Sequence, residues 1–389
     1  MKRILQVTNY MDRGGVETLL MNLYRTIDRT EFQFDFLTHP PTIDTVYSYE
    51  EEIKDLGGKV YKAPSFIKDP VAYKRFIVSF FDEHPEYHIV HAHNLDSAAM
   101  VYLREAKKRG CYTIAHSHNT KDHGNAIKRQ LLRLARKQTC RYADYFYACS
   151  PEAAEYAFGK KIASSNSCRM LHNGIDLSKY QVNEEIHQRN KKKLLPQCSG
   201  PVFCNVGRLM LQKNQTFLLD IFSQIVRRDD SARLIVLGEG ELHDDLLRKA
   251  LNLNIADKVL FLGSVPNVPD YLKASDVFLM PSLYEGLPLA AVEAQACGLP
   301  SLLTADMSPL TFCTDLVCPI SLSDSPDAWA RAALESYKVN LGRRTDRIEQ
   351  VRRNGFDIEQ VASELCDFYS SHGSFPSQTA TDNRTRGLA

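Results

Sequence analysis

A regular alternation between short apolar runs and longer amphipathic stretches is the feature that most constrains the fold of this chain. Stretches such as Glu17–Ile27 and Asp96–Lys108 repeat their apolar residues with helical periodicity. Strands that alternate with helices pair in parallel, because each helix carries the chain back to the starting edge of the sheet. The alternation therefore predicts an α/β domain built on a doubly wound parallel sheet. Its predicted strands are Ile4–Thr8, Phe32–Thr38, Ile89–Ala92, Tyr112–His116 and Tyr145–Cys149.

The alternation pauses and then restarts, which predicts a second domain of the same kind. The pause contains Leu171–Asp176 and a polar stretch, Lys179–Gly200, which we interpret as the linker and an entry helix. We place the two domains at 1–175 and 176–356. Open α/β sheets bind ligands outside the carboxyl ends of their strands, so we expect a central cleft where the two sheets face each other. The strands predicted for the second domain are Pro201–Val206, Leu234–Leu237, Val259–Leu262, Val277–Met280 and Ser301–Thr304.

Composition and charge exclude several classes of protein. Lys and Arg number 48 and Asp and Glu 47, for a net charge of +1, so we expect no nucleic-acid partner. The ten cysteines include no CxxC pair, which argues against a zinc ribbon and favours reduced thiols in a cytoplasmic protein. We expect neither a signal peptide nor a membrane span, because the apolar runs are too short. The polar tail 371–389 is expected to be disordered.

Two predicted strand-to-helix loops carry residues suited to an anion. Gly14 and Gly15 follow the first strand and open a helix, so that a ligand could approach the backbone and meet a helix N-terminus. A plain turn would also use two glycines, and the spacing is not that of a dinucleotide-binding GxGxxG. Arg208 and Lys213 lie in the first such loop of the second domain. This pair of cations suits a diphosphate, although solvent-exposed bases are the simpler interpretation of either one alone.

A third segment contains two carboxylates, Glu285 on a loop and Glu293 on the helix that follows. Small apolar residues surround Glu293, which argues against an ordinary surface position. Carboxylates are natural acceptors for the vicinal hydroxyls of a ribose or a sugar. The helix start between the two glutamates offers free backbone N–H groups to phosphate oxygens. The residues of that helix start are Gly286, Leu287, Pro288 and Leu289.

These motifs together resemble a known family of enzymes. Glu285 and Glu293 match the EX7E motif of retaining glycosyltransferases with the GT-B fold. The sequence resembles glycosyltransferase family 4 from Ile4 to about Gly298, and it is most similar there to bacterial enzymes of capsular and extracellular polysaccharide assembly. The resemblance implies a GT-B fold, with two Rossmann-like domains facing a central cleft. The other matching motifs are Gly14-Gly15, Gly207-Arg208, Lys213 and His172-Asn173-Gly174-Ile175-Asp176.

The resemblance also implies roles for individual residues. Glu293 would bind the ribose of a nucleotide sugar, and Glu285 would contact hydroxyls of the transferred sugar. Arg208 and Lys213 would hold the diphosphate, together with the amides from Gly286 to Leu289, and Gly15 would approach it from the first domain. Asn173, Gly174 and Asp176 would form the hinge. A C-terminal helix at about 357–370 would pack back on the first domain.

Histidines follow two neighbouring strands of the first domain. The family places a histidine that touches the donor sugar at the end of the strand that carries His116, and a slip of one strand period would give this role to His118 instead. His91 and His93 form a second pair at strand spacing, which raises the possibility of a metal site. Neither pair has a cysteine or an aspartate placed to act as a third metal ligand. The DxD pattern of metal-dependent sugar transferases does not occur in the sequence. We therefore expect no metal and no cofactor.

A strongly basic stretch between Ala126 and Ala143 is predicted to form an amphipathic helix. Ile127, Leu131, Leu134, Ala135 and Gln138 share one face of it, and six bases cover the other. Such a helix either docks on the protein through its apolar stripe or lies on an anionic membrane surface. The second interpretation would make the protein peripheral at the inner face of the cell membrane.

The expected reaction is transfer of a sugar from a nucleotide diphosphosugar to a saccharide or lipid-linked saccharide, with retention of anomeric configuration. A UDP-sugar is favoured by its frequency in the family. Arg208 and Lys213 would stabilise the departing diphosphate, while His116 and Glu285 would organise the reacting sugar. Two alternatives remain open, namely a nucleotide-sugar epimerase of the same architecture and a non-catalytic nucleotide-sugar binder.

Overall fold

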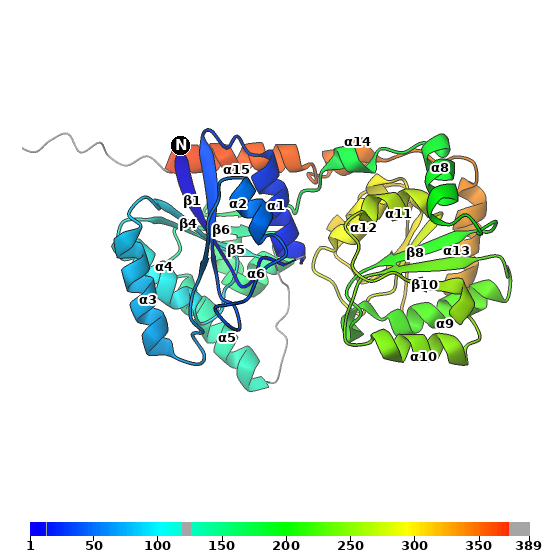
Figure 1. Ribbon diagram of the computed structural model, residues 1–389, viewed down its shortest axis with the longest axis horizontal. Helices are drawn as coiled ribbons and strands as arrows, with labels where there is room; N and C mark the ends of the chain where they lie inside the picture. The colour runs from blue at the N-terminus through cyan, green and yellow to red at the C-terminus, as the bar shows by residue number, and fades with distance from the viewer. Residues whose placement is uncertain (13, 119–125, 373–389) are drawn as a thin grey trace, which may run out of the picture.

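The computed structural model describes residues 1–12, 14–118 and 126–372, and it folds them into two α/β domains (Figure 1). Every strand pairs in parallel with its neighbours. The two Rossmann-like sheets confirm the predicted GT-B architecture.

The first domain has a seven-stranded sheet in the order β3-β2-β1-β4-β5-β6-β7. The strand order reverses beside β1, so the loops that leave β1 and β4 diverge to opposite faces and open a site between them. Its strands are β1 (Lys2–Thr8), β2 (Phe32–Thr38), β3 (Val60–Lys62), β4 (Ile89–Ala92), β5 (Tyr112–Ser117), β6 (Tyr145–Ala148) and β7 (Cys168–Met170). Its helices are α1 (Gly15–Thr26), α2 (Glu50–Asp55), α3 (Pro70–Glu83), α4 (Ala99–Lys108), α5 (Ala126–Thr139), α6 (Pro151–Phe158) and α7 (Lys160–Ala163).

The second domain has a six-stranded sheet in the order β10-β9-β8-β11-β12-β13, and the order reverses beside β8. Its strands are β8 (Val202–Val206), β9 (Arg233–Leu237), β10 (Val259–Phe261), β11 (Val277–Met280), β12 (Ser301–Thr304) and β13 (Val317–Ile320). Its α-helices are α8 (Glu184–Leu194), α9 (Gln215–Val226), α10 (His243–Asn252), α11 (Val268–Ala274), α12 (Leu289–Ala296), α13 (Pro326–Asn340) and α14 (Ile348–Arg353). Short 3₁₀ turns are η1 (Leu177–Tyr180), η2 (Leu211–Lys213), η3 (Ala256–Lys258) and η4 (Pro309–Thr311).

The C-terminal helix α15 (Ile358–His372) leaves the second domain and packs on the first, beside α1 (Figure 1). Its apolar residues, among them Leu365 and Tyr369, are buried in the same core as Phe34 and Ile114 of the first sheet. The first domain is therefore completed by the last helix of the chain.

Several sequence-based boundaries need correction. The predicted C-terminal helix at about 357–370 is the last of three helices, α13, α14 and α15, which are separated where Gly342 and Gly355 adopt positive φ angles of 70° and 82°. The expected tail begins too early, because Ser371 and His372 still belong to α15, and 373–389 lies outside the described residues. The basic helix ends at Thr139, before Ala143. Three strands, β3, β7 and β13, were not predicted.

Two adjacent chain segments join the domains. The backbone N–H of Ile175 donates to the carbonyl of Phe356 at 2.8 Å, and that of Ile358 donates to the carbonyl of Ile175 at 3.0 Å. At the predicted hinge residue Gly174, a Cβ atom would lie only 2.8 Å from Cα of Ile358, so a glycine is needed where the two segments touch. Asp176 follows and caps η1 by accepting from the backbone N–H of Ser178 at 3.2 Å.

Candidate active site

The loops that leave β1, β4 and β5 in the first domain meet those that leave β8 and β11 in the second, and we call this region the interdomain site. Two observations place the loops opposite each other. A Cβ atom added to Gly286 would lie 3.5 Å from the carbonyl oxygen of His118. The guanidinium of Arg208 is close enough to Glu17, on α1, to favour the ionised form of the Glu17 carboxylate.

The loops after β8 and β11 are bonded to each other at several points. The backbone N–H of Leu283 donates to the carbonyl of Gln212 at 2.8 Å, and Nε2 of Gln212 donates to the carbonyl of Tyr284 at 3.0 Å. Asn214, with a left-handed φ of 54°, donates from its amide to the carbonyl of Pro281 at 3.0 Å. The site in the second domain is thus preorganised before any ligand arrives.

Lys213 and Glu285, predicted separately to bind diphosphate and sugar, form an ion pair with Nζ and Oε1 2.7 Å apart. Both side chains are largely buried, at 17% and 6% exposure. Gly207 makes room for this lysine, because a Cβ atom there would lie 3.1 Å from its Cε. The ion pair was not foreseen from the sequence.

Arg208 is exposed and faces the first domain, near Glu17. Burial raises the pKa of Glu17, and the positive charge of Arg208 opposes that rise. Sequence reasoning missed Glu17, although its place in the first turn of a helix after Gly14-Gly15 was a usable signal. Gly15 would place an added Cβ in open space, so the fold itself does not require a glycine there.

Glu293 lies on α12, for which Pro288 is the N-cap residue, and Gly286 and Leu287 precede it. Burial raises the pKa of Glu293, whereas a hydrogen bond from the Tyr180 hydroxyl and the charge of Lys179 lower it. Tyr180 lies in the predicted linker, where the sequence gives it no role, yet it connects η1, directly after the hinge, to the predicted ribose-binding carboxylate.

Four histidines stack below the interdomain site. His116 is 1% exposed, and its ring lies 5.3 Å from that of His91 and 4.0 Å from that of His118. Neither nitrogen of His116 has a hydrogen-bond partner among the described residues. Burial, with the neighbouring His118, lowers the pKa of His91 to about 3. Burial lowers the pKa of His118 to about 4, and a hydrogen bond with the Asn173 side chain opposes that shift. These imidazoles are therefore neutral at physiological pH.

This stack bears on the question of a metal. Ligand atoms of His91, His93 and His116 lie within 4.8 Å of one another. Their rings are stacked on one another, with interplanar angles of 19° to 45°. Both nitrogens of His93 are also engaged, with His118 at 2.9 Å and with Gln6 at 2.8 Å. These two contacts occupy both ring nitrogens of His93, and the expectation of a site without metal stays a prediction.

The basic helix α5 packs differently from the prediction. Ala135 and Arg136 are buried, and the Arg136 guanidinium lies 4.6 Å from the ring centroid of Tyr156. Leu131 and Leu134 are 57% and 52% exposed. The expected apolar stripe is therefore not the face that docks on the protein, and Arg136 does not belong to the exposed basic face. The side chain of Ile127 lies outside the described residues.

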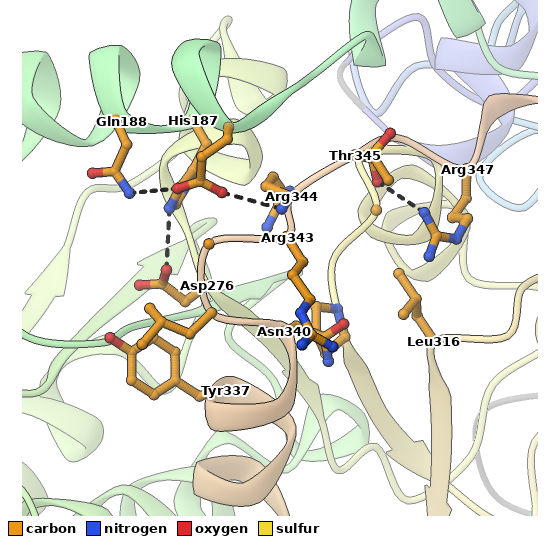
Figure 2. A pocket seen from close by; sticks show the side chains of 15 residues that line it. His187, Gln188, Asp276, Leu316, Tyr337, Asn340, Arg343, Arg344, Thr345 and Arg347 are labelled. Carbon is orange, nitrogen blue, oxygen red and sulfur yellow. Dashed lines mark hydrogen bonds and ion pairs between the residues drawn. The ribbon is translucent and has the colours of Figure 1, made fainter.

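A small hollow lies in the second domain and is lined by none of the residues of the interdomain site named above (Figure 2). Its volume of about 30 Å³ has room for roughly one water molecule. The buried guanidinium of Arg344 donates to the carbonyls of Cys297, Ser275 and Leu272 at 2.8, 2.9 and 3.0 Å. His187 pairs with Asp276 at 3.2 Å (Figure 2). These polar groups all have partners within the second domain, so they stabilise its packing.

The chain matches two family models, one for each domain. Residues 13–179 match Glycosyltransferase Family 4, and residues 187–351 match Glycosyl transferases group 1. EpsF of Bacillus subtilis (strain 168), whose name places it provisionally among the glycosyltransferases, is 31% identical over 373 residues, which cover 95% of this chain and 96% of EpsF.

Two further similarities extend over the whole chain. The capsular polysaccharide biosynthesis glycosyltransferase CapH of Staphylococcus aureus is 24% identical, with 95% of this chain and 99% of CapH covered. The crystal structure of Anabaena Alr3699/HepE in complex with UDP superposes with a TM-score of 0.76 at 17% identity, covering 95% of this chain and 100% of HepE. The sequence identity to EpsF over nearly the whole chain agrees with the two family matches and with the GT-B architecture. The chain therefore belongs to the group 1 glycosyltransferases of family 4.

Proposed function

We propose that this glycosyltransferase moves a sugar from a nucleotide diphosphosugar, with UDP-sugars favoured, to a hydroxyl of a saccharide or lipid-linked saccharide, and that it retains the anomeric configuration. The observation that carries the proposal is the Lys213–Glu285 ion pair, held between the loops after β8 and β11 and next to Gly286, which lies against His118 of the first domain. The cation proposed for the diphosphate and the carboxylate proposed for the sugar hydroxyls are therefore joined by a single hydrogen bond. The UDP complex of HepE supports the choice of nucleotide.

The residues of the interdomain site indicate how the negative charge on the departing diphosphate would be stabilised. The bond between the anomeric carbon and the diphosphate oxygen would break, while a new bond to the acceptor oxygen would form on the same face of the sugar. Arg208 and Lys213 would stabilise the charge that gathers on the departing diphosphate, and the acceptor proton would pass to it. We assign His116 to the donor sugar, with His118 as the alternative, and Glu293 to the ribose. In this proposal the reaction needs no metal.

The similarity to CapH supports a place in capsule or extracellular polysaccharide assembly. No helix within 1–12, 14–118 and 126–372 has the length and the apolar run needed to cross a bilayer. The exposed leucines of α5, Leu131 and Leu134, lie among the exposed bases Arg133, Lys137 and Arg141. Apolar side chains flanked by cations suit an anionic membrane surface, where a lipid-linked acceptor would be found. We include such peripheral contact, at the inner face of the cell membrane, in the proposal.

Product analysis tests this function. The protein is incubated with radiolabelled UDP-sugars and a membrane extract, with and without EDTA, and free nucleotide, free sugar and labelled acceptor are separated. The proposal expects labelled acceptor in both conditions, with the anomeric configuration of the donor. Altered nucleotide sugar without an acceptor would identify an epimerase, and binding without turnover a non-catalytic protein. Loss of transfer in EDTA, with recovery on addition of manganese, would contradict metal independence.

A further inference from the structure

Four aliphatic side chains of the first domain are exposed on two neighbouring segments, and we call them the apolar patch. Ile43 and Val46 lie in the loop after β2, while Ile67 and Val71 lie in the loop after β3 and in the first turn of α3. Their exposed fractions are 62%, 80%, 91% and 59% in that order. A single exposed aliphatic residue is ordinary on a protein surface, but a cluster of them marks a surface that meets a partner.

The two segments are bonded to each other, which holds the apolar patch in one place. Nε2 of His39 lies 2.7 Å from the hydroxyl of Tyr73, and Nζ of Lys68 donates to the carbonyl of Pro41 at 3.4 Å. The ring of Phe66 packs inward against that of Tyr73, with the two centroids 5.4 Å apart. Phe66 therefore fills the inner position of this turn, and the isoleucine that follows it is left outside.

Exposed cations accompany the apolar patch, and two of them share a face of α3 with Val71, because they lie three and four residues beyond it. The three cations are Lys68, Lys74 and Arg75. The two loops themselves carry two acids, Asp44 and Asp69, and Asp69 is engaged in capping the N-terminus of α3. Aliphatic side chains beside cations suit an anionic bilayer, where the cations meet the headgroups and the aliphatic groups reach the acyl boundary.

The apolar patch adjoins the interdomain site. Shortly after Val46, the backbone N–H and the hydroxyl of Ser48 donate to Oδ1 of Asp12 at 2.9 and 3.1 Å. The backbone N–H of Tyr49 donates to the carbonyl of Met11 at 3.2 Å. These bonds tie the loop after β2 to the loop after β1, which belongs to the interdomain site. Helices α3 and α5 begin on the same, lower edge of the first domain (Figure 1).

We propose that the apolar patch inserts into the acyl boundary of an anionic bilayer and thereby holds the interdomain site at the membrane surface, where the acceptor is a lipid-linked saccharide. Stable peripheral binding takes two signals, and here the patch supplies the apolar one and the bases of α5 supply the charged one. Loss of either should release the protein. The choice of a lipid-linked acceptor over a free saccharide rests on the proposed function, whereas the insertion does not.

Tryptophan fluorescence measures insertion directly, because the single tryptophan of the sequence, Trp329, is buried in the second domain. Ile67→Trp is mixed with phosphatidylglycerol vesicles whose acyl chains carry bromine close to the headgroup. Leu251→Trp is the matched control, since Leu251 is 62% exposed on α10 of the second domain. We expect a blue shift and quenching in Ile67→Trp only. Absence of quenching in Ile67→Trp, or equal quenching in both variants, overturns insertion.

Removal of the apolar side chains without a change of charge gives the second measurement. Ile43→Ser combined with Ile67→Ser should weaken binding to phosphatidylglycerol vesicles at least about tenfold, because two buried aliphatic side chains are lost. Leu251→Ser combined with Val339→Ser is the matched control, at exposed positions of the second domain. Thermal unfolding shows that both double variants are folded. Undiminished vesicle binding, or a change in oligomeric state in its place, overturns the proposal.

Transfer into a membrane extract tests the link to the acceptor. The double serine variant of the apolar patch should transfer less labelled sugar in proportion to its loss of vesicle binding. Full transfer despite lost binding overturns the link to a lipid-linked acceptor. If no UDP-sugar is turned over by the unmodified protein, the proposed function fails, and quenching and vesicle binding still decide whether the apolar patch inserts.

Discussion

The ammonium group of Lys213 lies 2.7 Å from the carboxylate of Glu285, at the point where the loops after β8 and β11 meet. A bound diphosphate would have to share this ammonium group with Glu285. Lys213→Ala is therefore expected to lower kcat/KM for transfer by about 10²–10³-fold, because the developing charge loses a preorganised cation.

Release of UDP from a nucleotide sugar measures this effect. Lys249→Ala is the matched control, since Lys249 forms a comparable ion pair with Asp220, at 2.6 Å, between α10 and α9. Equal rates for the two alanine variants would show that Lys213 does not contact the diphosphate.

Glu17 places a carboxylate near Arg208 from the opposite domain. Its charge competes with an incoming diphosphate for the same guanidinium, so Glu17→Gln is expected to tighten UDP binding by about two- to fivefold. Isothermal titration calorimetry measures the Kd, and Glu31→Gln, at an exposed position on the same domain, is the control. Weaker binding by Glu17→Gln would mean that the carboxylate itself helps to hold the nucleotide.

Helix α5 presents Leu131 and Leu134 to solvent. Replacing the exposed bases Arg133, Lys137 and Arg141 by Glu should abolish flotation with phosphatidylglycerol vesicles, because each base contributes about 1 kcal/mol to binding at an anionic surface. Arg136 is left unchanged, since its burial against Tyr156 would turn a charge reversal into a folding defect.

The same charge change on α8 of the second domain is the control for this experiment, at the exposed residues Arg189, Lys192 and Lys193. Vesicles of phosphatidylcholine alone test whether anionic lipid is needed. Undiminished flotation of the α5 variant would remove this helix from the proposed membrane contact.

The buried histidines predict how stability depends on pH. Burial lowers the pKa of His91 to about 3 and of His118 to about 4, whereas an unfolded chain titrates near about 6.5. The unfolded state therefore binds more protons below that pH, and the free energy of unfolding falls by about 1.4 kcal/mol per pH unit for each such histidine. Stability is fully present above about pH 6.5 and is lost as the pH falls toward the folded-state values.

Thermal unfolding between neutral and mildly acidic pH measures this slope. His91→Asn keeps an acceptor for the Tyr369 hydroxyl. It should lower the number of protons taken up on unfolding by about one, and the slope falls in proportion. An identical slope in the unmodified protein and His91→Asn would contradict burial of a neutral imidazole.

Much of the fold could be predicted because its signals are local. Phe32–Thr38, Val277–Met280 and Ser301–Thr304 were predicted with the bounds that the structure gives. Val277–Met280 is a continuous apolar run, as expected of a buried parallel strand, whereas Phe32–Thr38 shows the apolar and polar alternation of strand period. β3, β7 and β13 were missed because each is a short, partly exposed strand at the edge of its sheet, too short for periodicity to show.

The contacts of the candidate site depend on distant parts of the sequence. The motifs placed Lys213 and Glu285 on the correct loops, but their ion pair joins residues 72 positions apart. Gln6 and Tyr369, whose side chains are hydrogen-bonded, lie 363 positions apart, and no pattern along either strand or helix links them. Residue types at strand ends could thus be read from the sequence, whereas partners and protonation states required the assembled sheets.

The paired backbone segments at Ile175 and Asp357 restrict how the domains can move. A single connecting peptide would allow one domain to swivel and translate with many degrees of freedom. Two connections, bonded side by side, leave rotation about essentially one axis through the Gly174 contact. Each opening and closing cycle would then bring Lys213 and His118 back to the same mutual alignment, and the search for a reactive geometry would be short.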